Sequence, residues 1–375
     1  MLISHRKIGY RPTWIEVDLK ALAYNFKQVR SQLSPDTKIL VCVKSDAYGH
    51  GIVAVSRKLV SLGVDYLGVA SIDEGIVLRK AGINAPILVL GMVLPGDIEP
   101  VFRYRLTQTV CSEELALALN RMGKRRNQAA NIHIKIDTGM GRLGVLFTHA
   151  YSFIKEIRRL DYVNVEGIFT HFPCADIDPT FTRYQIEIFR GLIDSLYRED
   201  IRIPLCHAAN SMGVIGYKES HFNLVRPGLI IYGLYPRRNI KIRLKPVMSL
   251  KTKVVYLKRI PKGKGLSYGH TYRTKDNTTV VTLPIGYGDG YPRILSGRGD
   301  VLISGRRLRI SGRICMDQML VDVGSAKVKI GDEVILIGTD AKAAISAEEL
   351  AYRCGTIPYE IVCGIGNRVP RIYID

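Results

Sequence analysis

The first residue with chemical potential is a lysine that directly follows a hydrophobic run. The segment KILVCV, residues 38–43, predicts a buried strand, and Lys44 stands at its end. Enzymes built on α/β barrels carry their catalytic groups at the C-terminal ends of the strands. Lys44 has such a position, although position alone favours a lysine that simply marks where the strand leaves the core. A desolvated lysine in an active site can form a Schiff base with a carbonyl group.

Two later segments have the residue types of a phosphate site. CHAANSMG, residues 206–213, contains Asn210 and Ser211, which are favoured at the start of a helix, where free N–H groups attract anions. VRPGLIIYG, residues 225–233, contains Gly228, which permits close backbone approach. Barrels often bind phosphate with the loops after their seventh and eighth strands. A phosphate site facing a strand-end lysine predicts pyridoxal phosphate as the cofactor.

The elements that position these residues alternate between strand and helix. Amphipathic segments such as GIVAVSRKLVSLG and SEELALALNRM separate the strand-like runs, and this alternation predicts parallel strands with crossover helices. A doubly wound sheet would alternate in the same way, but eight units within about 200 residues favour a (β/α)8 barrel. The eight strand-like runs are residues 38–43, 66–70, 86–91, 106–110, 131–137, 163–171, 204–209 and 223–228.

The hydrophobic pattern changes after residue 245. Closely spaced strand-like runs follow, and only SAEELAYRC, residues 346–354, has the pattern of a helix. We therefore predict a barrel domain over residues 1–245 and a mostly β domain over residues 246–375. An additional strand at about 12–18 precedes the first barrel unit, and the C-terminal domain is its alternative pairing partner.

Composition narrows the class of protein. The chain has 375 residues, 47% of them hydrophobic and 23% charged, which is typical of a globular protein of two domains. No apolar run is long enough for a membrane span, and the N-terminus lacks the apolar core of a signal peptide. The seven cysteines include no C-x-x-C pair, so we expect neither a disulfide framework nor a metal site, and a cytoplasmic location.

The net charge of +20 is unevenly distributed. Residues 220–275 contain no Asp or Glu, and residues 237–264 contain eleven Lys or Arg. Such a stretch can bind nucleic acid or an anionic surface. Because its basic residues alternate with apolar ones, as in KTKVVYLKRI, the solvent face of a sheet is the favoured interpretation. We predict no nucleic-acid partner and no membrane partner.

Nine segments, in order, resemble the alanine racemases, a barrel-type family that depends on pyridoxal phosphate. They are VKSDAYGHG, IDTGMGRLG, THF, HAANS, RPGLIIYG, LSYGHTY, PIGYGDGYPR, GRICMDQ and GTIPYE. The resemblance covers nearly the whole chain. It implies a homodimer with shared active sites that interconverts L- and D-alanine and supplies D-alanine for cell-wall peptidoglycan.

The resemblance also implies a role for individual residues. Lys44 resembles the Schiff-base lysine and one racemisation base, and Tyr268 resembles the other base. Arg226 resembles the partner of the pyridine nitrogen, with His207 as its neighbour. Other matches imply cofactor contacts (Tyr48, Ser211, Gly228, Leu229, Tyr359), substrate-carboxylate contacts (Arg142 and the Met316 backbone), supporting residues (Lys135, His171, Asp317) and an access channel (Asp176, Arg293, Arg313, Ile357). Lys135 matches a lysine that is carbamylated in many members and orients the arginine seven residues on.

Chemistry agrees with these implied roles. Inversion of a stereocentre by proton transfer needs an acid–base group on each face, because a single base tends to return the proton to the face it left. A permanently charged arginine at the pyridine nitrogen keeps that nitrogen unprotonated, which distinguishes this pattern from decarboxylases that place a carboxylate there.

Three alternatives stay open from the sequence. One is a racemase for serine or a broader range of amino acids, since one methylene changes specificity by only about 1–3 kcal/mol. Another is a non-catalytic pyridoxal-phosphate carrier, which the β domain and Tyr268 argue against. The third is the nucleic-acid role of the acid-free stretch.

Overall fold

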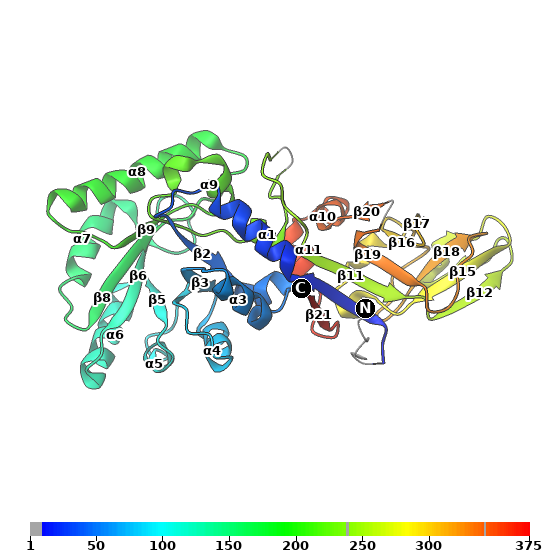
Figure 1. Ribbon diagram of the computed structural model, residues 1–375, viewed down its shortest axis with the longest axis horizontal. Helices are drawn as coiled ribbons and strands as arrows, with labels where there is room; N and C mark the ends of the chain where they lie inside the picture. The colour runs from blue at the N-terminus through cyan, green and yellow to red at the C-terminus, as the bar shows by residue number, and fades with distance from the viewer. Residues whose placement is uncertain (1–9, 238–239, 341–342) are drawn as a thin grey trace.

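The N-terminal two-thirds of the chain form a parallel barrel. A computed structural model describes residues 10–237, 240–340 and 343–375. In Figure 1 the barrel and its helices lie at one end of an elongated molecule, and the β-rich part lies at the other. The (β/α)8 barrel followed by a mostly β domain is therefore confirmed as the fold class. The division at residues 245 and 246 stays a prediction.

Eight parallel strands make the barrel wall. Two backbone hydrogen bonds join the ends of the strand path, from Asn223 N to Cys206 O at 3.4 Å and from Arg226 N to Ala209 O at 2.8 Å. These bonds bring the last strands beside each other and nearly close the ring. In spatial order the strands are β10 (Leu224–Val225), β2 (Lys38–Cys42), β3 (Tyr66–Val69), β4 (Ile87–Val89), β5 (Thr107–Val110), β6 (Ala130–Asp137), β8 (Val163–Phe169) and β9 (Leu205–His207), and the short β7 (Val145–Leu146) pairs with β6.

The barrel helices begin where the sequence supplies capping side chains. Asp18, Ser71, Ser112 and Asp178 each accept a hydrogen bond from an amide in the first turn of the helix that follows. Each helix buries one apolar face against the strands. The helices are α1 (Leu19–Arg30), α3 (Ile52–Ser61), α4 (Ile72–Lys80), α5 (Glu99–Arg103), α6 (Glu113–Arg126), α7 (Phe147–Ile157), α8 (Pro179–Arg198) and the short α9 (Ser211–Gly216).

The β-rich part contains one large sheet and two smaller ones. The large sheet has the order β17 (Arg306–Arg309), β16 (Asp300–Ile303), β19 (Glu333–Thr339), β11 (Met248–Lys253), β1 (Thr13–Asp18) and β21 (Arg371–Ile374), with β20 (Ala344–Ile345) beside β19. The smaller sheets are β12 (Tyr256–Ile260), β15 (Thr278–Leu283) and β18 (Met319–Gly324), and the pair β13 (Gly265–Leu266) and β14 (Tyr272–Arg273).

The first described strand links the two parts. β1 pairs antiparallel with β11 and parallel with β21, both in the β-rich part. Asp18, the last residue of β1, then caps α1 of the barrel. The N-terminal segment is thus fixed in the β-rich sheet before the chain enters the barrel.

The prediction of a single helix after residue 245 is wrong. Besides α10 (Ala347–Cys354), the structure contains α11 (Pro358–Gly364) and short 3-10 turns, of which η3 (Tyr268–His270), η4 (Tyr287–Asp289) and η5 (Arg293–Leu295) bear on the site. A helix of seven residues is too short to show a helical period in the sequence. Its proline at the first turn was the available signal.

The acid-free stretch forms partly exposed strands. In β11 the lysines occupy the half-buried positions, and Lys251 pairs with Glu16 and Glu333. In β12, which is an edge strand, Lys258 and Arg259 are exposed. This placement suits a solvated sheet face, and the lack of a nucleic-acid partner stays a prediction.

Three further properties concern only the described residues. None of the helices is both long enough and apolar enough to cross a bilayer. No group of three or more His, Cys, Asp or Glu side chains is arranged to hold a metal ion there. All seven cysteines are free thiols.

Candidate functional site

A cavity of about 440 Å³ opens at the C-terminal ends of the barrel strands. It brings together eleven of the residues singled out from the sequence, which are Lys44, Tyr48, Lys135, Arg142, His171, Asn210, Ser211, Arg226, Gly228, Ile357 and Tyr359. Four of its lining residues are lysine or arginine, and its lining contains no aspartate or glutamate. The cavity therefore suits an anionic ligand.

Lys44 is held at the mouth by an unusual turn. Ser45 to Tyr48 are all left-handed, with φ between 52° and 55°. The Asp46 carboxylate accepts a hydrogen bond from Ile52 N at 2.7 Å, and Ser45 N donates to Glu74 Oε1 at 2.6 Å. Non-glycine residues rarely adopt this conformation, so the surrounding contacts must hold it in place.

Helix α11 brings two residues from the far end of the chain to the barrel mouth. It approaches the Lys44 turn so closely that a Cβ on Gly49 would lie 2.3 Å from Val362 O. Gly49 also has a φ of +78°, so glycine is required there on both grounds. Through this contact Ile357 and Tyr359 reach the cavity, and the ring of Tyr359 lies 5.6 Å from that of Tyr48.

Gly228 and Ser211 form a small cradle on the cavity wall. Gly228 N donates to Ser211 Oγ at 3.0 Å. A Cβ on Gly228 would lie 2.5 Å from Tyr48 Oη, so only glycine leaves this space open. Asn210 caps the first turn of α9 by accepting from Gly213 N at 3.0 Å. The cradle has the backbone amides and hydroxyls that bind a phosphate group.

A chain of hydrogen bonds runs from Arg226 through the barrel interior. Arg226 Nη1 lies 2.8 Å from His207 Nδ1, and His207 Nε2 lies 2.8 Å from His133 Nδ1. Arginine can only donate, so each histidine must accept at Nδ1 and carry its proton on Nε2. His133 Nε2 then donates to Glu166 Oε2 at 3.3 Å. Both histidines are thereby fixed as neutral tautomers, and burial lowers the pKa of each.

Arg226 remains a cation in this setting. It is 4% exposed, and burial lowers its pKa to about 10, which still leaves it charged at neutral pH. Its Nη2 donates to the carbonyl oxygens of Thr170 and Ala208 at 2.6 and 2.9 Å, and lies 3.4 Å from His171 Nδ1. Burial and the charge of Arg226 hold the pKa of His171 well below its usual range, so His171 is neutral.

Lys135 and Arg142 also line the cavity, close enough for their charges to interact. Burial, then the charges of Arg142 and Arg226, lower the pKa of Lys135 to about 8. Its Nζ lies 5.7 Å from the ring centre of Phe169. Asp137 accepts from the amides of Gly139 and Met140, both at 2.9 Å, and so shapes the loop that presents Arg142.

Tyr268 and Met316 do not line the barrel cavity. They lie with Asp317 on a second cavity of about 570 Å³ in the β-rich part, and the two cavities share no lining residue. Tyr268 is 69% exposed and Met316 is 53% exposed. Arg313 lies beside Tyr268, since Ser267 Oγ donates to its carbonyl oxygen at 2.5 Å. Arg293 is exposed on η5.

The remaining sequence-derived residues surround the barrel cavity. His207 lies beneath it, bonded to Arg226. Leu229 follows Gly228 at the start of a 3-10 turn and is completely buried. Asp176 is close enough to Tyr359 for its charge to raise the pKa of that phenol, after the larger effect of burial.

Sequence reasoning missed three residues that line the cavity. They are Cys42, Leu90 and Phe169, each at or just after the end of a barrel strand. The ring of Phe169 stacks on His207 at 4.8 Å with an interplanar angle of 4°, and so helps to fix the imidazole beneath Arg226. Strand-end position was the available signal for all three.

The fold and this site together define a barrel enzyme whose strand-end lysine faces an anion-binding cavity. Residues 17–236 match the family model "Alanine racemase, N-terminal domain", and residues 247–373 match "Alanine racemase, C-terminal domain". The chain belongs to the alanine racemase family.

Individual relatives cover nearly the whole chain. The chain is 48% identical to the alanine racemase of Halothermothrix orenii over 367 residues, which is 97% of each protein. It is similar to the solved alanine racemase of Clostridium difficile 630, with a TM-score of 0.93, 39% identity, and 98% of this chain and 97% of that one covered. It is also similar to the Bacillus anthracis alanine racemase with bound L-Ala-P, with a TM-score of 0.92, 37% identity, and 98% and 96% covered.

Proposed function

We propose that this protein interconverts L- and D-alanine with pyridoxal phosphate as its cofactor. The observation that carries the proposal is the single cavity that gathers Lys44, Arg142 and Arg226 with the cradle at Gly228. The named relatives are alanine racemases, so a serine or broader racemase is not favoured. The proposed product, D-alanine, would serve cell-wall peptidoglycan. The seven free thiols support a cytoplasmic location.

The lining residues fit this cofactor. Its phosphate would be held by Ser211, the Gly228 cradle and Tyr359, where a side chain at position 228 would fill the space. Lys44 would hold the aldehyde carbon, and Arg226 would face the pyridine nitrogen. The bound cofactor supplies an electron sink that makes the substrate α-hydrogen acidic.

Arg226 limits the strength of that sink. Its charge is retained at neutral pH, and its neighbours His207 and His171 are neutral, so neither histidine is a protonated acid for a ring nitrogen. By keeping the ring nitrogen of a bound cofactor unprotonated, Arg226 would limit side reactions such as transamination.

Racemisation needs a second base opposite Lys44, and we propose that Tyr268 of a partner subunit supplies it in a homodimer. Two observations support sharing. Lys44 and Tyr268 line different cavities of one chain, and Tyr268 and Met316 are both more than half exposed. Arg142 and the Met316 backbone would together hold the substrate carboxylate. Arg293, Arg313, Asp176 and Ile357 would line the access channel.

Turnover of single enantiomers tests the proposed function. The purified chain with pyridoxal phosphate should racemise alanine with a kcat/KM at least about tenfold above that for serine, because a pocket rejects one added group by about 10–200-fold. Lys44→Ala should lower the rate by about 100-fold or more through loss of a base. A preference for serine would contradict the assignment of substrate.

Reductive trapping tests the cofactor lysine in the same preparation. Borohydride treatment followed by peptide mapping should place the cofactor on Lys44. Cofactor found on Lys135, the other lysine of the cavity, would overturn the assignment.

A further inference from the structure

Two backbone segments of the β-rich part are in direct contact beside Tyr268. We name them the GYGDG turn (Gly286–Gly290) and the CMD loop (Cys315–Asp317). Gly288 N donates to Met316 O at 2.8 Å. A Cβ on Gly286 would lie 2.4 Å from Met316 O, so the turn fits against the loop with no room for a side chain. The position of the Met316 backbone therefore depends on the position of the turn.

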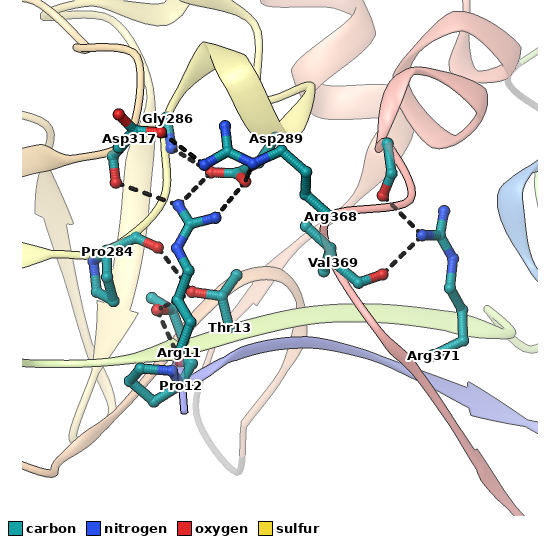
Figure 2. Close-up of polar contacts among 12 residues, drawn as sticks. Arg11, Pro12, Thr13, Pro284, Gly286, Asp289, Asp317, Arg368, Val369 and Arg371 are labelled. Carbon is teal, nitrogen blue, oxygen red and sulfur yellow. Dashed lines mark hydrogen bonds and ion pairs between the residues drawn. The ribbon is translucent and has the colours of Figure 1, made fainter. Parts of the chain in front are cut away.

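The GYGDG turn is itself fixed through one buried carboxylate. Asp289 is completely buried and accepts from Gly286 N at 3.0 Å. The Arg11 guanidinium donates to both Asp289 oxygens, at 2.5 Å each, and Arg368 Nε lies 3.6 Å from Oδ1 (Figure 2). Such a paired contact fixes the orientation of the Asp289 carboxylate relative to the Arg11 guanidinium as well as the distance between them.

The same two arginines also hold the CMD loop. Arg11 Nη2 donates to Asp317 O at 3.2 Å, and Arg368 Nη2 donates to Asp317 Oδ1 at 2.7 Å. Figure 2 shows both guanidinium groups between Asp289 and Asp317. Each arginine thus bridges the buried carboxylate of the turn and the end of the loop.

Arg11 reaches this place because the chain around it is anchored. Thr13 Oγ1 donates to Pro284 O at 2.8 Å, just before the GYGDG turn, and Thr252 Oγ1 donates to Pro12 O at 3.0 Å. Pairing of β1 with β11 follows immediately. The backbone that carries Arg11 is therefore fixed both to the large sheet, through β11, and to Pro284 at the start of the turn.

We propose that Arg11, Asp289 and Arg368 form an ionic clamp that positions the CMD loop and thereby the Met316 backbone that contacts the substrate carboxylate. The inference rests on the proposed function, which gives Met316 that role. Met316 is 53% exposed as a residue, so its burial contributes little to the position of its backbone. The three clamp residues are positioning residues that act through the loop.

Steady-state kinetics of Arg11 variants tests the clamp. Arg11→Ala should raise KM for alanine about tenfold and change kcat less than about threefold, because a contact made equally to bound substrate and transition state affects KM. Arg11→Lys keeps the charge but not the paired contact, so its KM should lie between that of the wild type and that of Arg11→Ala.

Arg307→Ala is the matched control. Arg307 pairs with Asp300 in the same domain, and the side-chain exposures of 35% and 7% resemble the 29% and 0% of Arg11 and Asp289. This control should lower the melting temperature as Arg11→Ala does but leave KM within about twofold. Equal KM values for the two alanine variants would overturn the clamp.

Hydrogen exchange gives a readout that is independent of turnover. Backbone amides in peptides covering residues 284–290 and 313–318 should exchange faster in Arg11→Ala than in the wild type. In Arg307→Ala the exchange rates of these peptides should equal those of the wild type. Unchanged exchange in Arg11→Ala would refute the clamp even in an inactive preparation. A wild type that does not racemise alanine would instead refute the proposed function and leave the exchange comparison valid.

Discussion

Lys135 is the one buried lysine among the residues that the structure describes. It is 3% exposed, and burial together with Arg142 and Arg226 lowers its pKa from the usual 10.5 to about 8. The neutral amine is therefore populated at lower pH than in an ordinary lysine. A neutral amine adds to carbon dioxide and loses one proton, which gives an anionic carbamate. Such an anion beside Arg142 would offset the excess of positive charge in the cavity.

We expect a carbamate on Lys135 whose population rises with pH. Below a pH of about 8 the amine is mostly protonated and unreactive, and above it the neutral form predominates, so the signal should grow as the pH rises through that value. Carbon-13 NMR under labelled carbon dioxide at constant pressure measures it. Lys135→Met is the control, and identical spectra for the variant and the wild type would contradict the prediction.

The turn after β2 is the element that places Lys44. Its four left-handed residues are not glycine, so local residue preference does not predict this conformation. The contacts of Asp46 with Ile52 and of Ser45 with Glu74 come from other elements and hold the turn. These four residues do not favour a left-handed backbone by themselves, and contacts with other elements hold them in it.

A β-branched residue in this turn should be costly. Ser45 is exposed at a φ of +54°, where valine is strongly disfavoured, so Ser45→Val should lower the free energy of unfolding by about 1 kcal/mol or more. Ser31→Val is the control, because Ser31 is exposed at a φ of −67° and should change stability by less than about 0.5 kcal/mol. Urea unfolding compares the two, and equal losses would show that the turn conformation is not the cause.

The arrangement of the chain as a whole separates the two proposed bases. Lys44 lies at the barrel mouth and Tyr268 lies on a different cavity in the β-rich part. Because Tyr268 is 69% exposed, it is free to enter the barrel mouth of another chain. A two-fold dimer would complete two identical sites in this way.

Subunit mixing tests the shared site. Lys44→Ala and Tyr268→Ala homodimers should each be nearly inactive. After random exchange half of the dimers are mixed, and each mixed dimer has one intact site of two, so about a quarter of wild-type activity should return. Differential tagging confirms that exchange has occurred. If both bases belonged to one chain, every chain would carry a lesion in its own site and exchange would restore nothing.

Several features could be predicted from the sequence because they depend on local pattern. Hydrophobic periodicity gave the strand and helix alternation of the barrel, and the change after residue 245 gave the β-rich part. Its position at a strand end identified Lys44 as a candidate site residue, and their helix-capping residue types identified Asn210 and Ser211. Each of these signals lies within a few residues of the feature it predicts.

Other features were decided only by the tertiary structure, because their partners are far apart in the sequence. Glu166 and His133 connect to Arg226 only across the barrel interior, and α11 reaches the cavity only by packing on the Lys44 turn. Arg11 meets Asp289 across 278 positions of chain. Periodicity and spacing carry no information about which distant side chains will meet, since the packing of the whole chain sets those contacts.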